Sequence, residues 1–186
     1  MEYITRAPKL TFWRASTDND RGAGFGHERS VWMTAAMFAR TENFKLKEEE
    51  NSVTVSWDYI LPAPHTSKVR AVYTVSADGS IRTELLYAGE EGIPGLPAFG
   101  MAFRLKDRYD RFRYYGCGPE ENYCDRRAGA RLGIFKSTAY ENLPPYLVPQ
   151  ECGNRTGVRW LEVHDGEGRG LRFKAETEME ASVLPY

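Results

Sequence analysis

The chain is poor in cysteine and histidine, with three of each, and has no excess of either charge. Its 186 residues carry 25 lysines and arginines against 26 aspartates and glutamates, a net charge of −1. That balance argues against binding to nucleic acid, because no basic excess is available to neutralise phosphates. No apolar stretch approaches membrane-spanning length, and the chain does not start with the basic and apolar run of a signal peptide. We therefore expect no nucleic-acid partner and no membrane partner.

The three thiols belong to Cys117, Cys124 and Cys152. An odd count is untypical of a secreted disulfide framework and favours free thiols in a reducing compartment. A bridge between Cys117 and Cys124, across the turn that separates them, stays open as an alternative.

Alternation of apolar and polar residues dominates the chain. Residues 51–60 place Val53, Val55, Trp57 and Tyr59 on one face of a strand and polar residues on the other. Asp78-Gly79 supplies the turn of a tight hairpin between two further strands. In all, strands are predicted over residues 51–60, 68–75, 81–87, 99–105, 112–115, 131–138, 158–164 and 170–175.

One helix is predicted over residues 27–40, where apolar residues recur at near-helical spacing without glycine or proline. Many antiparallel strands with one helix predict an all-β fold, a large antiparallel β-sandwich forming a single domain over residues 1–186. Aromatic residues make up 13% of the chain, which is typical both of such a core and of proteins that handle carbohydrate.

Three polar segments interrupt the strands. The first signature is Trp13-Arg14-Ala15-Ser16-Thr17-Asp18-Asn19-Asp20, the second is Gly118-Pro119-Glu120-Glu121-Asn122-Tyr123-Cys124-Asp125-Arg126, and the third is Pro149-Gln150-Glu151-Cys152-Gly153-Asn154-Arg155. Polar residues at this density between apolar strands indicate a polar site or a buried hydrogen-bonded seam. The candidate sugar-site or interface residues are Arg14, Asp18, Asn19, Asp20, Glu121, Asn122, Tyr123, Asp125, Arg126, Glu151, Asn154 and Arg155.

In order and spacing the signatures resemble the C-terminal, small-chain region of the large β-galactosidases of glycoside hydrolase family 2. The family's usual forms are R-A-P-T-D-N-D, G-P-x-E-N-Y-x-D-R and P-Q-E-x-G-N-R-T, and the resemblance runs through essentially all of the chain. Ser16 replaces the usual proline, Gly157 replaces a usual aspartate, and Cys124 and Cys152 occupy variable positions. The Gly157 change bears most on whether the third signature keeps its usual shape.

The resemblance implies a galactose-mutarotase-like supersandwich, truncated at its C-terminal end. It also implies that the chain is a piece of a longer enzyme that hydrolyses terminal non-reducing β-D-galactose residues in β-D-galactosides. In the family a preceding (β/α)8 barrel carries the catalytic glutamates, so this region would supply scaffold and part of the active-site wall. We expect no cofactor here, because the family's Mg and Na ions lie in other domains. A cytoplasmic location is expected, and homo-oligomerisation of the parent is left open.

The residues themselves also argue against a catalytic pair. Glu120 and Glu121 are neighbours and would point to opposite faces of a strand, which is poor geometry for glycoside hydrolysis. Asp18 and Asp20 sit in a turn-like context, where accepting hydrogen bonds from turn amides and arginine is the expected role. No catalytic residue is assigned, and an oxygen-rich cation site at Asp18, Asn19 or Asp20 stays an alternative.

The histidines, His27, His65 and His164, are far apart and form no metal-binding motif. No metal site is therefore predicted from them. A stand-alone carbohydrate-binding or mutarotase-like module is the alternative function, but a mutarotase needs a base and an acid that converge on the sugar. None of the histidines stands in a context that suggests such a role.

The third signature is the best candidate for a site surface, with Tyr123, Tyr146 and Trp160 near enough in sequence to stack on a sugar ring. The competing interpretation is a salt-bridged seam that holds strands or a neighbouring barrel in place. In either case the three signatures are expected to meet in space. Arg14 or Arg126 should then pair with a carboxylate from another signature.

Overall fold

The computed structural model describes residues 2–62 and 67–186, so His65 lies outside the described residues. The chain divides into two compact units, one of Met1–Pro8 with Phe103–Tyr186 and the other of Lys9–Ala102. Strands β1 (Ile4–Thr11) and β6 (Gly100–Leu105) form a two-stranded sheet, and the division falls inside both strands. The single domain expected over residues 1–186 stays a prediction.

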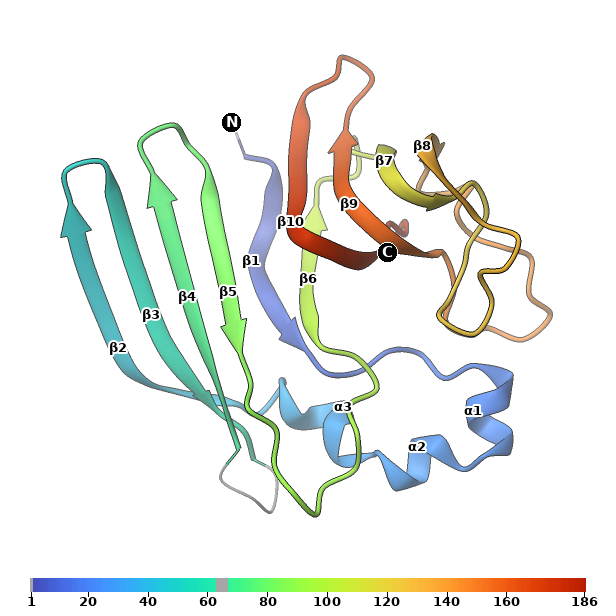
Figure 1. The fold of residues 1–186 in the computed structure, drawn as a ribbon, viewed down its shortest axis with the longest axis horizontal. Coiled ribbons are helices and arrows are strands. Elements are labelled where there is room, and N and C mark those ends of the chain that lie inside the picture. Colours follow the sequence, from blue (N-terminus) through green and yellow to red (C-terminus); the bar gives the residue numbers. More distant parts are fainter. Residues whose placement is uncertain (1, 63–66) are drawn as a thin grey trace. The chain divides into compact units, whose positions relative to one another are not determined.

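The Lys9–Ala102 unit is built on an antiparallel sheet in the order β2-β3-β4-β5 (Figure 1). Its strands are β2 (Arg40–Glu49), β3 (Ser52–Ile60), β4 (Lys68–Ser76) and β5 (Ile81–Leu86). Val53 pairs with Val75 and Trp57 with Ala71, so the apolar residues of neighbouring strands share one face. Of the two turn residues predicted to have positive φ, Gly79 adopts φ 84° and Asp78 does not have a positive φ.

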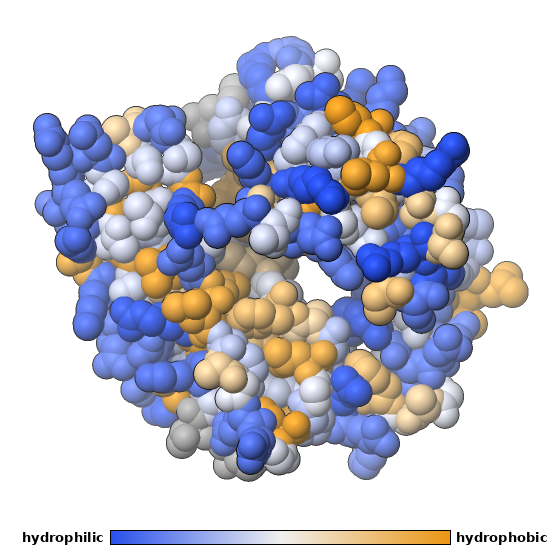
Figure 2. Space-filling view, viewed as in Figure 1, coloured by the Kyte–Doolittle hydropathy of each residue, from blue (hydrophilic) through white to orange (hydrophobic). Residues whose placement is uncertain are grey.

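The core of this unit gathers on that apolar face and consists of Leu10, Phe12, Trp32, Ala35, Leu61 and Val69. The opposite face of β3 carries Asp58, which is buried and accepts from Asn43 at 2.9 Å and from Arg70 at 3.2 Å. The Asn43 bond comes first among the causes that hold the pKa of Asp58 below its usual value. Hydrophilic side chains cover the turn between β2 and β3, at the upper left of Figure 2.

The helix predicted over residues 27–40 is wrong. Three short helices are present instead, α1 (Asp18–Gly22), α2 (Phe25–Glu28) and α3 (Val31–Ala35), and β2 already begins at Arg40. Helices this short are marginal on their own, so tertiary packing decides where they form. Trp32 and Ala35 are buried in the core, whereas Met37 and Phe38 are exposed by 75% and 62%. Met37 and Phe38, the large apolar residues after Ala35, therefore gain too little burial to extend the helix.

The other unit contains a second antiparallel sheet, in the order β10-β9-β7-β8. Its strands are β7 (Arg111–Gly118), β8 (Arg131–Thr138), β9 (Asn154–His164) and β10 (Gly170–Ser182). Its core consists of Tyr109, Phe112, Tyr114, Val158, Leu161 and Val163. Phe112 and Tyr114 of β7 pair with Val163 and Leu161 of β9 on one face of the sheet. The opposite face mixes charged residues with Tyr115, Trp160 and the exposed Leu132 and Ile134.

A row of charges crosses the face of the sheet opposite the core. Arg113 of β7, Glu162 of β9 and Arg172 of β10 stand opposite one another in register, and each guanidinium lies 2.7 Å from a carboxylate oxygen of Glu162. In the next row Trp160 lies beneath both arginines, whose guanidinium carbons are 5.4 and 5.1 Å from its ring centroid. The row therefore combines ion pairing with cation–π contact.

The prediction of an all-β fold of antiparallel strands is confirmed, with the single helix replaced by three short ones. Cys117, Cys124 and Cys152 are all free, so the Cys117–Cys124 bridge does not form. Among the described residues, none of the helices is both long and apolar enough to cross a membrane.

Candidate functional site

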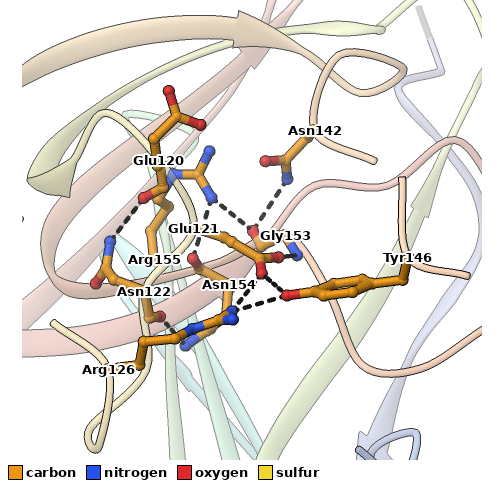
Figure 3. Close-up of polar contacts among 9 residues, drawn as sticks. All are labelled: Glu120, Glu121, Asn122, Arg126, Asn142, Tyr146, Gly153, Asn154 and Arg155. Carbon is orange, nitrogen blue, oxygen red and sulfur yellow. Dashed lines mark hydrogen bonds and ion pairs between the residues drawn. The ribbon is translucent and has the colours of Figure 1, made fainter. Parts of the chain in front are cut away.

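The second and third signatures meet at the point where β7 ends and β9 begins (Figure 3). The backbone amide of Asn122 donates to the carbonyl of Asn154 at 2.9 Å, and the side-chain amide of Asn154 donates back to the Asn122 carbonyl at 3.1 Å. The Asn154 amide also reaches Glu180 of β10 at 3.0 Å. This part of the predicted meeting of the signatures is confirmed.

Asn122 is the centre of this seam and is 2% exposed. Its Nδ2 donates to the carbonyls of Cys117 and Glu120 at 3.0 and 2.9 Å. Its Oδ1 accepts from the backbone amide and the hydroxyl of Thr156 at 3.0 and 2.6 Å. Both ends of the amide are therefore satisfied, as a buried polar side chain requires.

Glu121 joins the two signatures a second time. One carboxylate oxygen accepts from the Tyr146 hydroxyl and from Arg126, and the other accepts from the backbone amide of Gly153 at 2.8 Å. The side chain of Glu121 is 13% exposed. Burial, followed by the hydrogen bond to Glu121, raises the pKa of the Tyr146 hydroxyl. Both oxygens of Glu121 are thus occupied by groups that hold the loops together.

The expected pairing of Arg126 with another signature is wrong, because its ion-pair partner Glu121 belongs to its own signature. The connection to the third signature instead passes through the Glu121 carboxylate and the Gly153 amide. Arg14 and the rest of the first signature lie in the Lys9–Ala102 unit. Whether the first signature meets the other two stays a prediction.

Arg155 is 6% exposed and bonds to neutral groups. Its Nε donates to the Tyr114 hydroxyl at 2.9 Å, and its Nη1 donates to the carbonyls of Gly153 and Asn154 at 3.3 and 3.1 Å. Tyr114 in turn donates to the carbonyl of Pro119 at 3.2 Å. Within residues 2–62 and 67–186, no carboxylate lies at ion-pair distance from this guanidinium. Carbonyl dipoles and the Tyr114 ring, 5.7 Å away, stabilise its charge.

Asn142 completes the seam and was missed by the sequence analysis. It is 4% exposed, and its Nδ2 donates to the carbonyls of Gly153 and Val183 at 3.0 and 2.9 Å. Nothing in the surrounding Glu-Asn-Leu-Pro segment distinguishes a buried asparagine from an ordinary turn residue. Tyr114 was missed because it resembles a routine strand residue. Thr156 was not singled out either, although it matches the final threonine of the form P-Q-E-x-G-N-R-T.

The remaining candidates of these signatures are placed as follows. Asp125 is exposed and Glu151 is half-buried. Tyr123 is half-buried, and its hydroxyl oxygen is buried without a hydrogen-bond partner among the described residues. Burial is the largest of the causes that raise the pKa of Tyr123.

The three aromatic residues proposed to stack on a sugar are already engaged within the chain. Arg126 lies 5.3 Å from the Tyr123 ring centroid, the Tyr146 hydroxyl binds Glu121, and Trp160 lies beneath two arginines. A sugar would have to compete with these guanidinium groups for the rings. The stacking role stays a prediction.

The first signature forms the start of α1. Thr17 caps the helix, and Thr17 and Asp20 exchange hydrogen bonds in a capping box, Asp20 Oδ2 accepting from the Thr17 amide at 2.8 Å. The Arg14 guanidinium donates to both oxygens of the same carboxylate, from Nη1 to Oδ2 at 2.5 Å and from Nη2 to Oδ1 at 3.2 Å. Asp18 pairs with Arg21 at 2.6 Å.

These contacts weaken the case for a cation site at Asp18, Asn19 and Asp20, because arginine and turn amides already occupy the Asp20 oxygens. Among the described residues no group of three His, Cys, Asp or Glu side chains is placed to hold a metal. The expected role of Asp18 and Asp20, accepting hydrogen bonds from arginine and turn amides, agrees with this geometry.

Asp20 should make stability depend on pH. The hydrogen bond from Arg14 is the main cause that lowers the pKa of Asp20 from 3.8 to about 2. Because the folded pKa is depressed, the stabilisation is complete above about pH 4 and is lost as the pH falls toward 2. We expect Asp20→Asn to cost about 1–2 kcal/mol at neutral pH and almost nothing near pH 2. Urea unfolding at both pH values measures this, and an equal loss at both would contradict it.

Comparison with known proteins gives matches along the whole chain. The family model described as "Beta galactosidase small chain" matches residues 1–186. The chain is 40% identical to the β-galactosidase BgaC of Bifidobacterium adolescentis and 41% identical to a β-galactosidase of Lactobacillus delbrueckii subsp. bulgaricus. Each match covers 100% of this chain and 18% of the relative, so the chain spans about a fifth of their length.

A shorter relative is covered more completely. The β-galactosidase small subunit of Latilactobacillus sakei is 34% identical over 217 residues, a match that covers 100% of this chain and 67% of the relative. With the family model matched over every residue, the chain belongs to the β-galactosidase small chain family.

Proposed function

We propose that the chain is a domain of a larger β-galactosidase that hydrolyses terminal non-reducing β-D-galactose residues. The observation that carries the proposal is the match of the entire chain to β-galactosidases about five times its length. The signatures of the sequence favour a parent of the large type in glycoside hydrolase family 2. In that parent the two four-stranded sheets would contribute to a galactose-mutarotase-like supersandwich.

Within that enzyme the role proposed for this chain is scaffold and part of the active-site wall. The carboxylates of Glu121 and Asp20 are occupied by arginine, tyrosine and backbone amides. A glycosidase needs two carboxyl groups that face each other across the scissile bond. The geometry of Glu121 and Asp20 supports structural rather than catalytic roles. The acid and the nucleophile are proposed to come from a preceding (β/α)8 barrel.

The other features of the parent follow from the same proposal. Its Mg and Na ions would bind in other domains. The proposal allows the parent to be a homo-oligomer. The free thiols of Cys117, Cys124 and Cys152 support a reducing, cytoplasmic location.

We expect the 186-residue chain alone to show no turnover of nitrophenyl β-D-galactoside, whereas the complete protein hydrolyses it. The reason is that both catalytic acids are proposed to lie outside the chain. Purified preparations of each, assayed at equal molar concentration, provide the measurement. Turnover by the isolated chain that disappears in Glu121→Gln would refute the scaffold role. A change in the mutarotation rate of galactose on adding the chain would instead favour the stand-alone module.

A further inference from the structure

The loop between β8 and β9, residues 139–153, carries an exposed apolar tip. Leu147 is 102% exposed and Val148 is 50% exposed, and Leu143 and Tyr140 in the same loop are exposed by 38% and 66%. A connection of this length without secondary structure is uncommon in compact domains and is usually functional. We call residues 143–149 the prong.

The prong is anchored on its N-terminal side and at Tyr146. On its N-terminal side Asn142 is buried and bonded to Gly153 and Val183. Within it the Tyr146 hydroxyl binds the Glu121 carboxylate (Figure 3). The Tyr146 backbone amide donates to the Pro144 carbonyl at 2.8 Å. Pro144, Pro145 and Pro149 restrict the backbone further, because each ring fixes one φ angle.

A single exposed apolar residue is ordinary on a protein surface, but here two adjacent apolar residues, Leu147 and Val148, are exposed together. Two adjacent aliphatic residues stand at the tip of a loop whose conformation is fixed by buried polar groups. A tip that is already ordered loses little conformational entropy when it binds, and that is the usual advantage of pre-organisation. Residues of the second and third signatures, Glu121 and Gly153, make the hydrogen bonds that hold this loop in place.

We propose that the prong inserts Leu147 and Val148 into an apolar groove of the rest of the parent β-galactosidase, outside these 186 residues. The inference rests on the proposed function. The chain spans about a fifth of its long relatives, which leaves four-fifths of such an enzyme to cover its surface. A relative of the same family is named a small subunit, which supports association with a second, larger part. The groove is expected to be lined by aliphatic or aromatic side chains that match the prong.

Cysteine labelling in the complete enzyme tests whether the tip is covered. The Leu147→Cys variant is treated with a maleimide, and the rate at residue 147 is followed by mass spectrometry in the native and the urea-unfolded enzyme. We expect labelling at least about tenfold slower in the native enzyme, because the groove must open before the thiol reacts. A labelling rate in the native enzyme that is less than about tenfold slower than in the unfolded enzyme overturns the proposal. Labelling of Cys124 in the urea-unfolded sample corrects for differences in maleimide reactivity between preparations.

A photo-crosslinking side chain at position 148 identifies what covers the tip. Crosslinks to parts of the enzyme outside this chain support the proposal. Crosslinks to residues 9–102, crosslinks to a second copy of this chain, or the absence of any crosslink overturn it. β-Galactoside hydrolysis by the unmodified complete protein is measured separately. Lack of hydrolysis would refute the proposed function, whereas an uncovered tip in an active enzyme would refute only the docking of the prong.

Discussion

Replacement of Asn122 by alanine is expected to lower the free energy of unfolding by about 3–5 kcal/mol. The change removes four side-chain hydrogen bonds at a position that is 2% exposed. It leaves the amide and hydroxyl of Thr156 and the carbonyls of Cys117 and Glu120 without their partner. Each buried group that loses its partner costs about 1–3 kcal/mol, and local relaxation recovers part of the sum.

Urea unfolding followed by tryptophan fluorescence measures the loss, with Asn51→Ala, at an exposed turn position, as the control. The isosteric Asn122→Asp variant separates hydrogen bonding from volume, because it places a carboxylate oxygen against the carbonyls of Cys117 and Glu120. We expect it to be strongly destabilised at neutral pH and less so in acid, where the carboxyl is protonated and can donate. A loss below about 1 kcal/mol in Asn122→Ala would mean that water takes over the role of the amide.

Gly153→Ala is the second change with a large expected effect, a loss of about 2–4 kcal/mol. Gly153 has φ +73°, and a Cβ there would lie 2.6 Å from Asn142 Nδ2 and 2.9 Å from Leu184 Cδ2. The added methyl group must push Asn142 away from the carbonyls it binds. Backbone strain and overpacking therefore act together.

A second glycine separates the two contributions. Gly168 has φ +80°, but an added Cβ there would meet nothing within 4 Å, so Gly168→Ala reports the strain alone. Gly129→Ala, with neither feature, serves as the baseline. If Gly153→Ala and Gly168→Ala lose equal stability in urea unfolding, then Asn142 yields without penalty, and its bonds to Gly153 and Val183 contribute little.

Strands with clear alternation of apolar and polar residues were predictable. The prediction over residues 51–60 agrees with β3, because apolar and polar residues alternate from Ser52 to Tyr59. β2 was not predicted, since every residue in it is exposed and most are charged; its pairing with β3 places it in the sheet. The strand predicted to begin at residue 158 begins at Asn154. Its first residues are polar but buried against the second signature, a tertiary effect that periodicity does not record.

The region of the candidate site was predictable, but its pairings were not. Polar residues clustered in turns indicated a seam, and Asn122, Asn154 and Glu121 do lie together. Thr156, 34 residues after Asn122, binds the Asn122 side chain, and Asn142 binds the Gly153 carbonyl. Asn142 carries no local signal, whereas Thr156 ends the family form P-Q-E-x-G-N-R-T but was not singled out. Every residue has the same backbone carbonyl, so the carbonyl that a side chain binds is decided by which segments the fold brings together. Sequence patterns therefore identify such donors only when the motif itself contains them.

The row of Arg113, Glu162 and Arg172 bears on how the sheet selects its alignment during folding. Side chains alternate between faces, so sliding β10 by one residue along β9 would turn Phe173 toward water and Arg172 toward the apolar core. Sliding by two residues would keep the faces and would place either Gly170 or Lys174 opposite Glu162. Gly170 offers Glu162 no charge, whereas Lys174 offers one cation in place of Arg172. The charge row therefore disfavours the slide toward Gly170, a misalignment that hydrophobic patterning alone would tolerate.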